Sequence, residues 1–87
     1  MPVVFVPPPL RSLTAGQSQV TVTGTTLVEV IEQLEASYPG LRQRLCEEGR
    51  LKPEIQVAIN QTMGIRDLRR SLDEGDEIHF LPAIGGG

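Results

Sequence analysis

The sequence is poor in aromatic residues, with no tryptophan, one tyrosine and two phenylalanines among 87 residues. Aliphatic side chains must therefore form the interior, and a chain of this length has room for one domain with a modest core. The single cysteine, Cys46, excludes an internal disulfide and favours a reducing compartment such as the cytoplasm. No membrane span or signal peptide is expected, because prolines 7–9 interrupt the short apolar opening, which has no basic leader.

The chain also lacks an excess of positive charge. Eight Lys and Arg stand against eleven Asp and Glu, for a formal charge of −3, and the basic residues alternate with acidic ones. Nucleic-acid binding usually needs a basic stripe and stacking aromatics, so we expect no nucleic-acid partner.

Catalytic and metal-binding signals are equally scarce. The single histidine, His79, lies between two apolar residues of an expected strand and should face away from both. Acidic neighbours follow Cys46 and should raise its thiol pKa, so we expect no reactive thiolate there. No group of His, Cys, Asp and Glu has the spacing of a metal site, and no nucleophile lies near a base. We therefore expect neither an enzyme nor a bound metal or cofactor.

Hydrophobic periodicity nevertheless predicts a regular fold. Leu27, Val30, Ile31 and Leu34 recur with the period of one amphipathic helix, which a Thr26 capping box should begin and residues 38–40 should end. We expect short helical turns at residues 41–46 and 68–72. Alternation of polar and apolar residues, or a β-branched run, predicts strands at residues 3–6, 19–23, 54–60 and 77–81.

This order predicts an α+β fold in which a mixed sheet of four to five strands packs on one main helix. The β-grasp, or ubiquitin-like, fold has this order, as do a few other small folds. We expect residues 1–82 to form the domain and residues 83–87 to form a flexible glycine-rich tail. Glycine has no Cβ, so such a tail suits a narrow channel and leaves a terminal carboxylate uncrowded. The alternative is an incidental frayed end.

Three segments resemble the MoaD/ThiS-type sulfur carriers. Residues 72–87 read LDEGDEIHFLPAIGGG, which is similar to the family's Gly-Asp turn, apolar strand, Leu-Pro and terminal Gly-Gly. Residues 24–40 resemble the family's helix, and residues 57–60 its central strand and turn. The resemblance is closest to the subgroup that carries sulfur for cysteine biosynthesis, from which Gly85 departs because that subgroup tends to have Ala there.

The resemblance implies a function. An E1-like adenylating enzyme would use ATP and Mg²⁺ to activate the Gly87 carboxylate, and a sulfur donor would convert it to a thiocarboxylate. That sulfur would pass to a sulfur-accepting synthase, for the cysteine branch a pyridoxal-phosphate-dependent cysteine synthase. Gly85 and Gly86 would give clearance, and Ile84 and Leu81 would dock the partner. The alternatives are a molybdopterin-synthase small subunit, a thiamine sulfur carrier, a ubiquitin-like protein modifier, and an interaction module without tail chemistry.

Overall fold

A computed structural model describes residues 1–82 of the chain, and residues 83–87 lie outside the described part. Within residues 1–82, the chain forms six short strands, two α-helices and one 3-10 helix, η1. In order these are β1 Val3–Phe5, η1 Pro8–Thr14, β2 Gln19–Thr21, α1 Leu27–Ser37, α2 Leu41–Leu45, β3 Cys46–Glu47, β4 Arg50–Leu51, β5 Ile55–Ile59 and β6 Glu77–Pro82.

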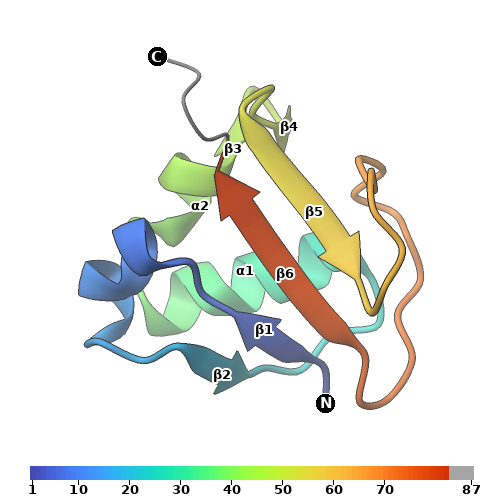
Figure 1. Cartoon of the computed structure of the whole chain (residues 1–87), viewed down its shortest axis with the longest axis horizontal. Coiled ribbons are helices and arrows are strands. Elements are labelled where there is room, and N and C mark those ends of the chain that lie inside the picture. Colours follow the sequence, from blue (N-terminus) through green and yellow to red (C-terminus); the bar gives the residue numbers. More distant parts are fainter. Residues whose placement is uncertain (83–87) are drawn as a thin grey trace.

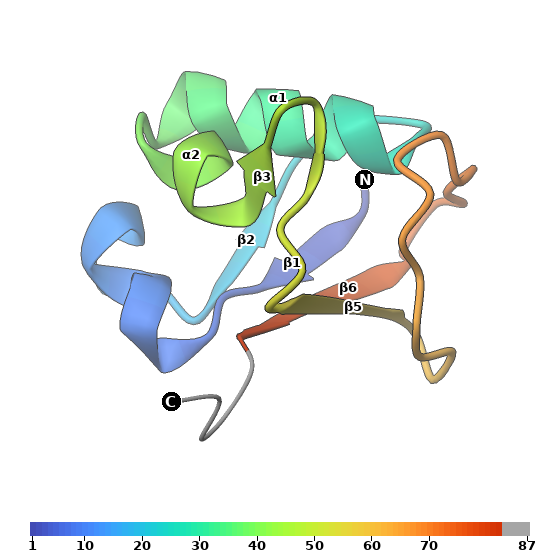
Figure 2. The same cartoon turned by 90° about the horizontal axis from the view of Figure 1, so that it is seen from above.

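The main sheet has four strands in the order β2-β1-β6-β5. The last strand, β6, is parallel to β1 and antiparallel to β5, and β1 is antiparallel to β2 (Figure 1). The helix α1 covers one face of this sheet and leaves the other face open (Figure 2). This arrangement confirms the β-grasp fold that the order of elements predicts.

The interior lies between α1 and the covered face of the sheet. The four periodic residues of α1 are all buried, with at most 2% of each side chain exposed. Val4, Ile78 and Phe80 meet them from β1 and β6 and are equally buried. Because each such side chain contributes roughly 1.5–3 kcal/mol when fully buried, aliphatic packing can hold the fold with few aromatic residues.

The cap of α1 confirms part of the expected capping box. The Thr26 hydroxyl accepts a hydrogen bond from the Glu29 N–H at 3.4 Å. The Glu29 carboxylate, however, accepts from the Thr25 N–H at 2.8 Å and from the Thr25 hydroxyl at 3.0 Å, one residue before the cap. The carboxylate therefore fixes the chain as it enters the helix.

One 3-10 helix and one small hairpin were not expected from the sequence. The prolines that follow β1 begin η1, in which the Leu10 N–H donates to the Pro7 carbonyl at 2.9 Å. Strands β3 and β4 form a small hairpin through Glu48 and Gly49, both with positive φ, of 54° and 76°. Positive φ at both central residues is the geometry of a tight two-residue hairpin.

The expected helical turn at residues 68–72 is wrong. The Asp67 carboxylate accepts the Arg69 N–H at 2.9 Å, and the Asp67 carbonyl accepts the Arg70 N–H at 3.0 Å, which makes a tight turn instead. Asp is favoured in turns because its side chain bonds to the backbone two residues on. Leu72 still enters the core, with its N–H bonded to the Thr25 carbonyl at 2.9 Å.

Candidate functional site

The last strand fixes the point from which residues 83–87 continue. Beyond His79, which pairs with Phe5 of β1, the strand β6 is held by β5 alone, where Leu81 pairs with Gln56 and Pro82 with Ile55. The Arg66 guanidinium in turn donates to the Ile55 carbonyl at 2.9 Å. It also donates to the carbonyl of Leu51, at the end of β4, at 3.1 Å and to the carbonyl of Lys52, which follows β4, at 3.0 Å. The partner strand of Pro82 is therefore anchored by a charged side chain.

The open face of the sheet carries an apolar patch beside this point. Phe5 and His79 stack with ring centroids 4.3 Å apart and planes 6° from parallel. Leu81 follows on the same face with 40% of its surface exposed, and the Arg11 guanidinium lies at the border, held by the Val6 carbonyl at 2.9 Å. We call Phe5, Arg11, His79 and Leu81 the tail-side patch.

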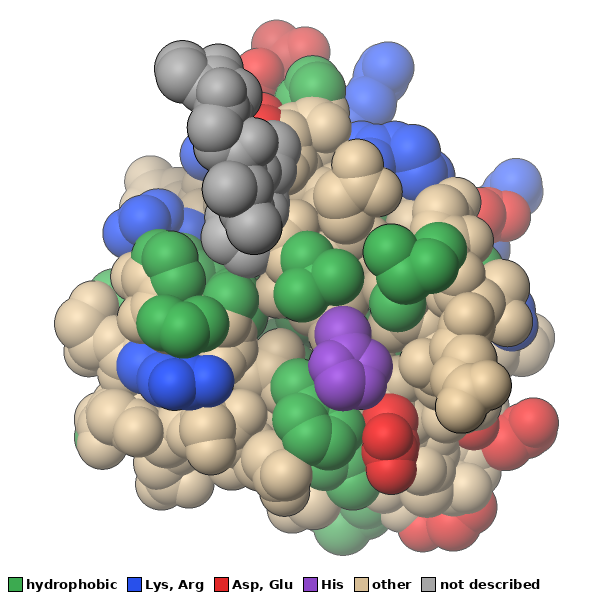
Figure 3. All heavy atoms as spheres, viewed as in Figure 1, with side chains coloured by type: hydrophobic (Ala, Val, Ile, Leu, Met, Phe, Trp, Pro, Cys, Tyr) green, Lys and Arg blue, Asp and Glu red, His purple; other side chains and the backbone are tan. Residues whose placement is uncertain are grey.

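The tail-side patch surrounds a shallow hollow of about 370 Å³, which all four of its residues line. Figure 3 shows the histidine in the middle of this face, with hydrophobic side chains on several sides of it. An apolar hollow bordered by one cation, at the end of the last strand, is a suitable surface for an apolar side chain of another protein.

The structure places the expected site residues as follows. Leu81 lies exposed on the open face of the sheet and not in the core, which leaves it available for contact, and its docking role stays a prediction. His79 faces away from Ile78 and Phe80 as expected, and its ring is half-buried against Phe5. Ile84, Gly85, Gly86 and Gly87 lie outside the described residues.

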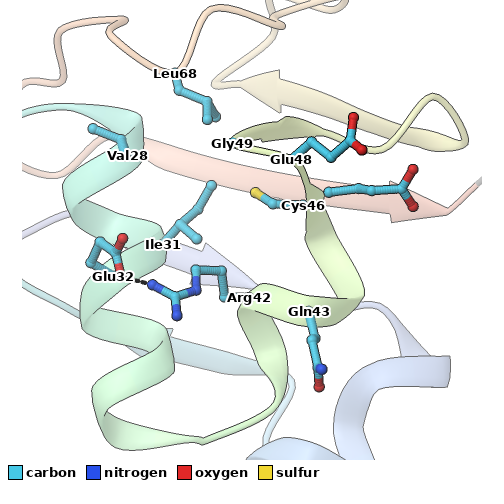
Figure 4. A pocket seen from close by; sticks show the side chains of 10 residues that line it. Val28, Ile31, Glu32, Arg42, Gln43, Cys46, Glu48, Gly49 and Leu68 are labelled. Atoms are coloured by element: carbon cyan, nitrogen blue, oxygen red, sulfur yellow. Dashed lines mark hydrogen bonds and ion pairs between the residues drawn. The ribbon is translucent and has the colours of Figure 1, made fainter.

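A second hollow, of about 350 Å³, lies between α1, α2 and the β3–β4 hairpin (Figure 4). Cys46 lines it, and at its rim the Arg42 guanidinium pairs with the Glu32 carboxylate at 2.7 Å. Burial raises the pKa of the Cys46 thiol above its ordinary value, and the positive charge of Arg42 opposes this effect. The Cys46 pKa is therefore raised, as the sequence predicts. The main cause is burial, however, and not the acidic residues that follow Cys46.

Two further observations concern metal binding and membrane-spanning helices in the described residues. Within residues 1–82, no group of three or more His, Cys, Asp and Glu side chains is placed to hold a metal ion. Among the helices of the same part of the chain, none is long and apolar enough to cross a membrane.

Sequence reasoning missed two members of the tail-side patch, Phe5 and Arg11. Phe5 reaches His79 only through the parallel pairing of β1 with β6, which joins residues 74 positions apart (79 − 5). Arg11 lies in η1, a helix that was not predicted from the sequence. The available signal was the alternation of Val4, Phe5 and Val6, which places Phe5 on the face opposite the core.

A mixed four-stranded sheet, one main helix and a final strand in the middle of the sheet define a ubiquitin-like β-grasp protein. The chain belongs to the ThiS family, whose model matches residues 4–87. It is 36% identical to the sulfur carrier protein CysO of Mycobacterium tuberculosis over 90 residues, covering 97% of this chain and 96% of that one.

Two other comparisons extend this result. A crystal structure of the Amycolatopsis orientalis BexX/CysO complex contains a chain that superposes with a TM-score of 0.92 at 32% identity, with both chains fully covered. The small archaeal modifier protein 3 of Haloferax volcanii is 36% identical over 64 residues, covering 71% of this chain and 70% of that one.

Proposed function

We propose that this chain is a sulfur carrier whose Gly87 carboxylate is loaded as a thiocarboxylate and donated to a biosynthetic acceptor, with cysteine biosynthesis favoured. The observation that carries the proposal is the ThiS-family match, which extends through the final glycines. The relative named as a sulfur carrier covers nearly the whole length of both chains, which supports the cysteine branch.

The chemistry requires an activated carboxylate, because a free carboxylate is a poor electrophile. Attack of the Gly87 carboxylate on the α-phosphorus of ATP forms an acyl-adenylate and releases pyrophosphate. A sulfur donor then attacks the acyl carbon and AMP leaves, so that a thiocarboxylate remains. The thiocarboxylate sulfur is a nucleophile that attacks an activated acceptor, and hydrolysis of the acyl–sulfur bond returns the carboxylate. In this scheme the chain is a protein co-substrate, and ATP and Mg²⁺ belong to an E1-like partner.

The described residues support this role in two ways. The strand β6 lies between two neighbours, and its end is fixed through Ile55 and Arg66, so the domain can present residues 83–87 from a defined position. Residues 83–87 span up to about 17 Å when extended, which suffices to enter a pocket of a partner. The tail-side patch lies beside the end of β6 and offers apolar contact to the same partner through Leu81, and Ile84, three residues further along the chain, would be a second docking residue.

The experiment is a loading assay with a purified adenylating enzyme of the E1 type, ATP, Mg²⁺ and sulfide, followed by intact-mass measurement. We expect a mass gain equal to the exchange of one oxygen for one sulfur, located on Gly87 by fragmentation. A control chain with one alanine added after Gly87 should gain nothing, because its carboxylate is displaced from the reacting position. If loading is equal in both chains, or absent in both with an enzyme that loads another family member, the proposal is wrong.

The match to the Haloferax modifier supports a second candidate, a ubiquitin-like protein modifier. It would use the same adenylate, but the final bond would be an isopeptide bond between Gly87 and a lysine amine. Mass spectrometry of the chain from its native cells separates the two functions. Thiocarboxylate on the free chain supports the carrier, and branched peptides that contain the terminal glycines on lysine support the modifier.

A further inference from the structure

The two edges of the main sheet differ in how their backbone groups are satisfied. On the outer edge of β5, the Val57 carbonyl accepts the Ile65 N–H at 3.1 Å, and the Ile55 carbonyl accepts from Arg66. The Ile59 N–H and carbonyl both bond to Thr62, at 3.0 and 2.9 Å. The segment that follows β5 therefore closes this edge against another strand.

The β2 edge is open. Ser18 and Val22 bond to the residues on either side of β1: the Val6 N–H donates to the Ser18 carbonyl at 2.9 Å, and the Val22 N–H donates to the Pro2 carbonyl at 3.2 Å. Because alternate residues of an antiparallel strand bond to the same neighbour, the N–H and carbonyl groups of Gln19 and Thr21 point away from β1. Within residues 1–82, no strand lies beyond β2 and no hydrogen bond reaches these four groups (Figure 1).

The same edge is also uncharged. Residues 17–23 read QSQVTVT and contain no charged residue or proline, two of the features with which proteins block a free edge. A hollow of about 340 Å³ runs beside β2, and uncharged side chains alone line it: Val3, Gln17, Gln19, Val20, Thr21 and Tyr38. The other two hollows described above each have charged side chains in their walls.

We propose that the β2 edge pairs antiparallel with β2 of a second copy of this chain, so that the two sheets form one continuous sheet of eight strands. In this register Val20 lies opposite Val20 of the second copy on the two-fold axis. Gln19 then lies opposite Thr21 of the second copy, and Thr21 opposite Gln19. The four open backbone groups of each copy are all used, which gives four interchain hydrogen bonds.

The lack of charge argues for a second copy over a strand of another protein. A two-fold interface sets each surface patch against its own duplicate, so a charged edge would face like charge. With a net charge of −3 per copy, an uncharged edge is the place where two copies approach at least cost. The contact is short and the dimer should be weak and transient. The strand β6, which carries His79 and Leu81, lies two strands, roughly 10 Å, from this edge, so both side chains stay exposed in the dimer. Gln19 also lines the tail-side hollow, but the dimer uses its backbone groups and does not depend on the proposed function.

The test is a cross-linking experiment that reads the register. Gln19→Cys and Thr21→Cys are made separately in a Cys46→Ala background and mixed in a glutathione redox buffer. We expect the mixed disulfide to exceed either self-disulfide, since only Gln19 and Thr21 of opposite copies face each other. The matched control is Gln56→Cys mixed with Thr21→Cys, because Gln56 is exposed but lies on β5, beyond the opposite end of the sheet.

Sedimentation equilibrium of the unaltered chain measures the dimer dissociation constant independently. Protein concentrations up to about 1 mM are used, because a weak interface has a dissociation constant in this range. Thr21→Pro removes an outward N–H from each copy and should raise the dissociation constant about tenfold or more, whereas Thr21→Val should leave it unchanged. Thr21→Lys adds an edge charge and serves if the proline variant does not fold. The proposal is wrong if the chain stays monomeric at these concentrations, or if the mixed disulfide forms no more than the control disulfide does. It is also wrong if the β2 amides become protected from exchange only when another protein is added.

Discussion

Substitution of Gly24 by alanine should destabilise the domain strongly. Gly24 has a φ of +153°, in a region that residues with a Cβ rarely adopt. A Cβ built there would lie 3.0 Å from the Val30 Cγ2 and 3.1 Å from the Val30 backbone nitrogen. The backbone atom belongs to α1 and has little freedom to move away. Gly24 thus allows the chain to pass close against the first turn of the helix.

The loss of stability follows from the backbone strain and from the forced contact with Val30. Backbone strain at a positive φ costs about 1–3 kcal/mol, and the forced contact adds about 1–3 kcal/mol. The free energy of unfolding should therefore fall by about 2–6 kcal/mol, which for a domain of this size lowers the midpoint of thermal unfolding by about 10 °C or more.

The assay is urea unfolding followed by circular dichroism, with Gly16→Ala as the matched control. Gly16 also has a positive φ, of 83°, but a Cβ there would meet nothing within 4 Å. Gly16→Ala should lose only the stability that backbone strain costs. The difference in unfolding free energy between the two variants therefore measures the contact with α1. If Gly24→Ala costs no more than Gly16→Ala, the contact argument is refuted.

Three further predictions concern exposed or half-buried side chains. Leu81→Asp should lower the rate of thiocarboxylate loading about tenfold. The control is Met63→Asp, which should leave loading unchanged because Met63 is 60% exposed but lies outside the tail-side patch. Both variants should have the same unfolding free energy as the original chain. Backbone and hydroxyl donors of Thr25 hold the Glu29 pKa below its ordinary value of 4.5, so this carboxylate stabilises the fold above that pH and the contribution is lost as pH falls through the lowered pKa. The stability difference between the original chain and Glu29→Gln should therefore shrink in acid, and a constant difference would contradict the assignment. Burial raises the Cys46 pKa, so iodoacetamide should label this thiol more slowly in the folded chain than in urea at the same pH, and equal rates would refute it.

The helix α1 could be predicted from its local sequence pattern alone. The spacing of Leu27, Val30, Ile31 and Leu34 specified α1 and its buried side, and residues 38–40 specified its end, all of which the structure confirms. Capping and periodicity act within a few residues, so one segment contains the whole signal. The turn at Asp67 was missed because the apolar pair Leu68 and Leu72 fits a helix equally well, and only the bonds of the Asp67 side chain and carbonyl to the backbone decide between them.

The resemblance of the final stretch to a family pattern predicted the ThiS-family membership that the comparisons confirm. The proposed roles of Gly85, Gly86 and Gly87 come from that stretch alone, and they stay predictions because these residues lie outside the described part.

The sequence by itself determined the main helix, the four strands of the sheet and the family, because these depend on residue order, periodicity and local backbone chemistry. Only the tertiary structure decided that Phe5 stacks on His79, that Arg11 borders the tail-side patch, and that one sheet edge is closed while the other is open. Such features depend on which strands become neighbours and in which register. That choice is made by packing between residues far apart in the chain, and no local pattern encodes it.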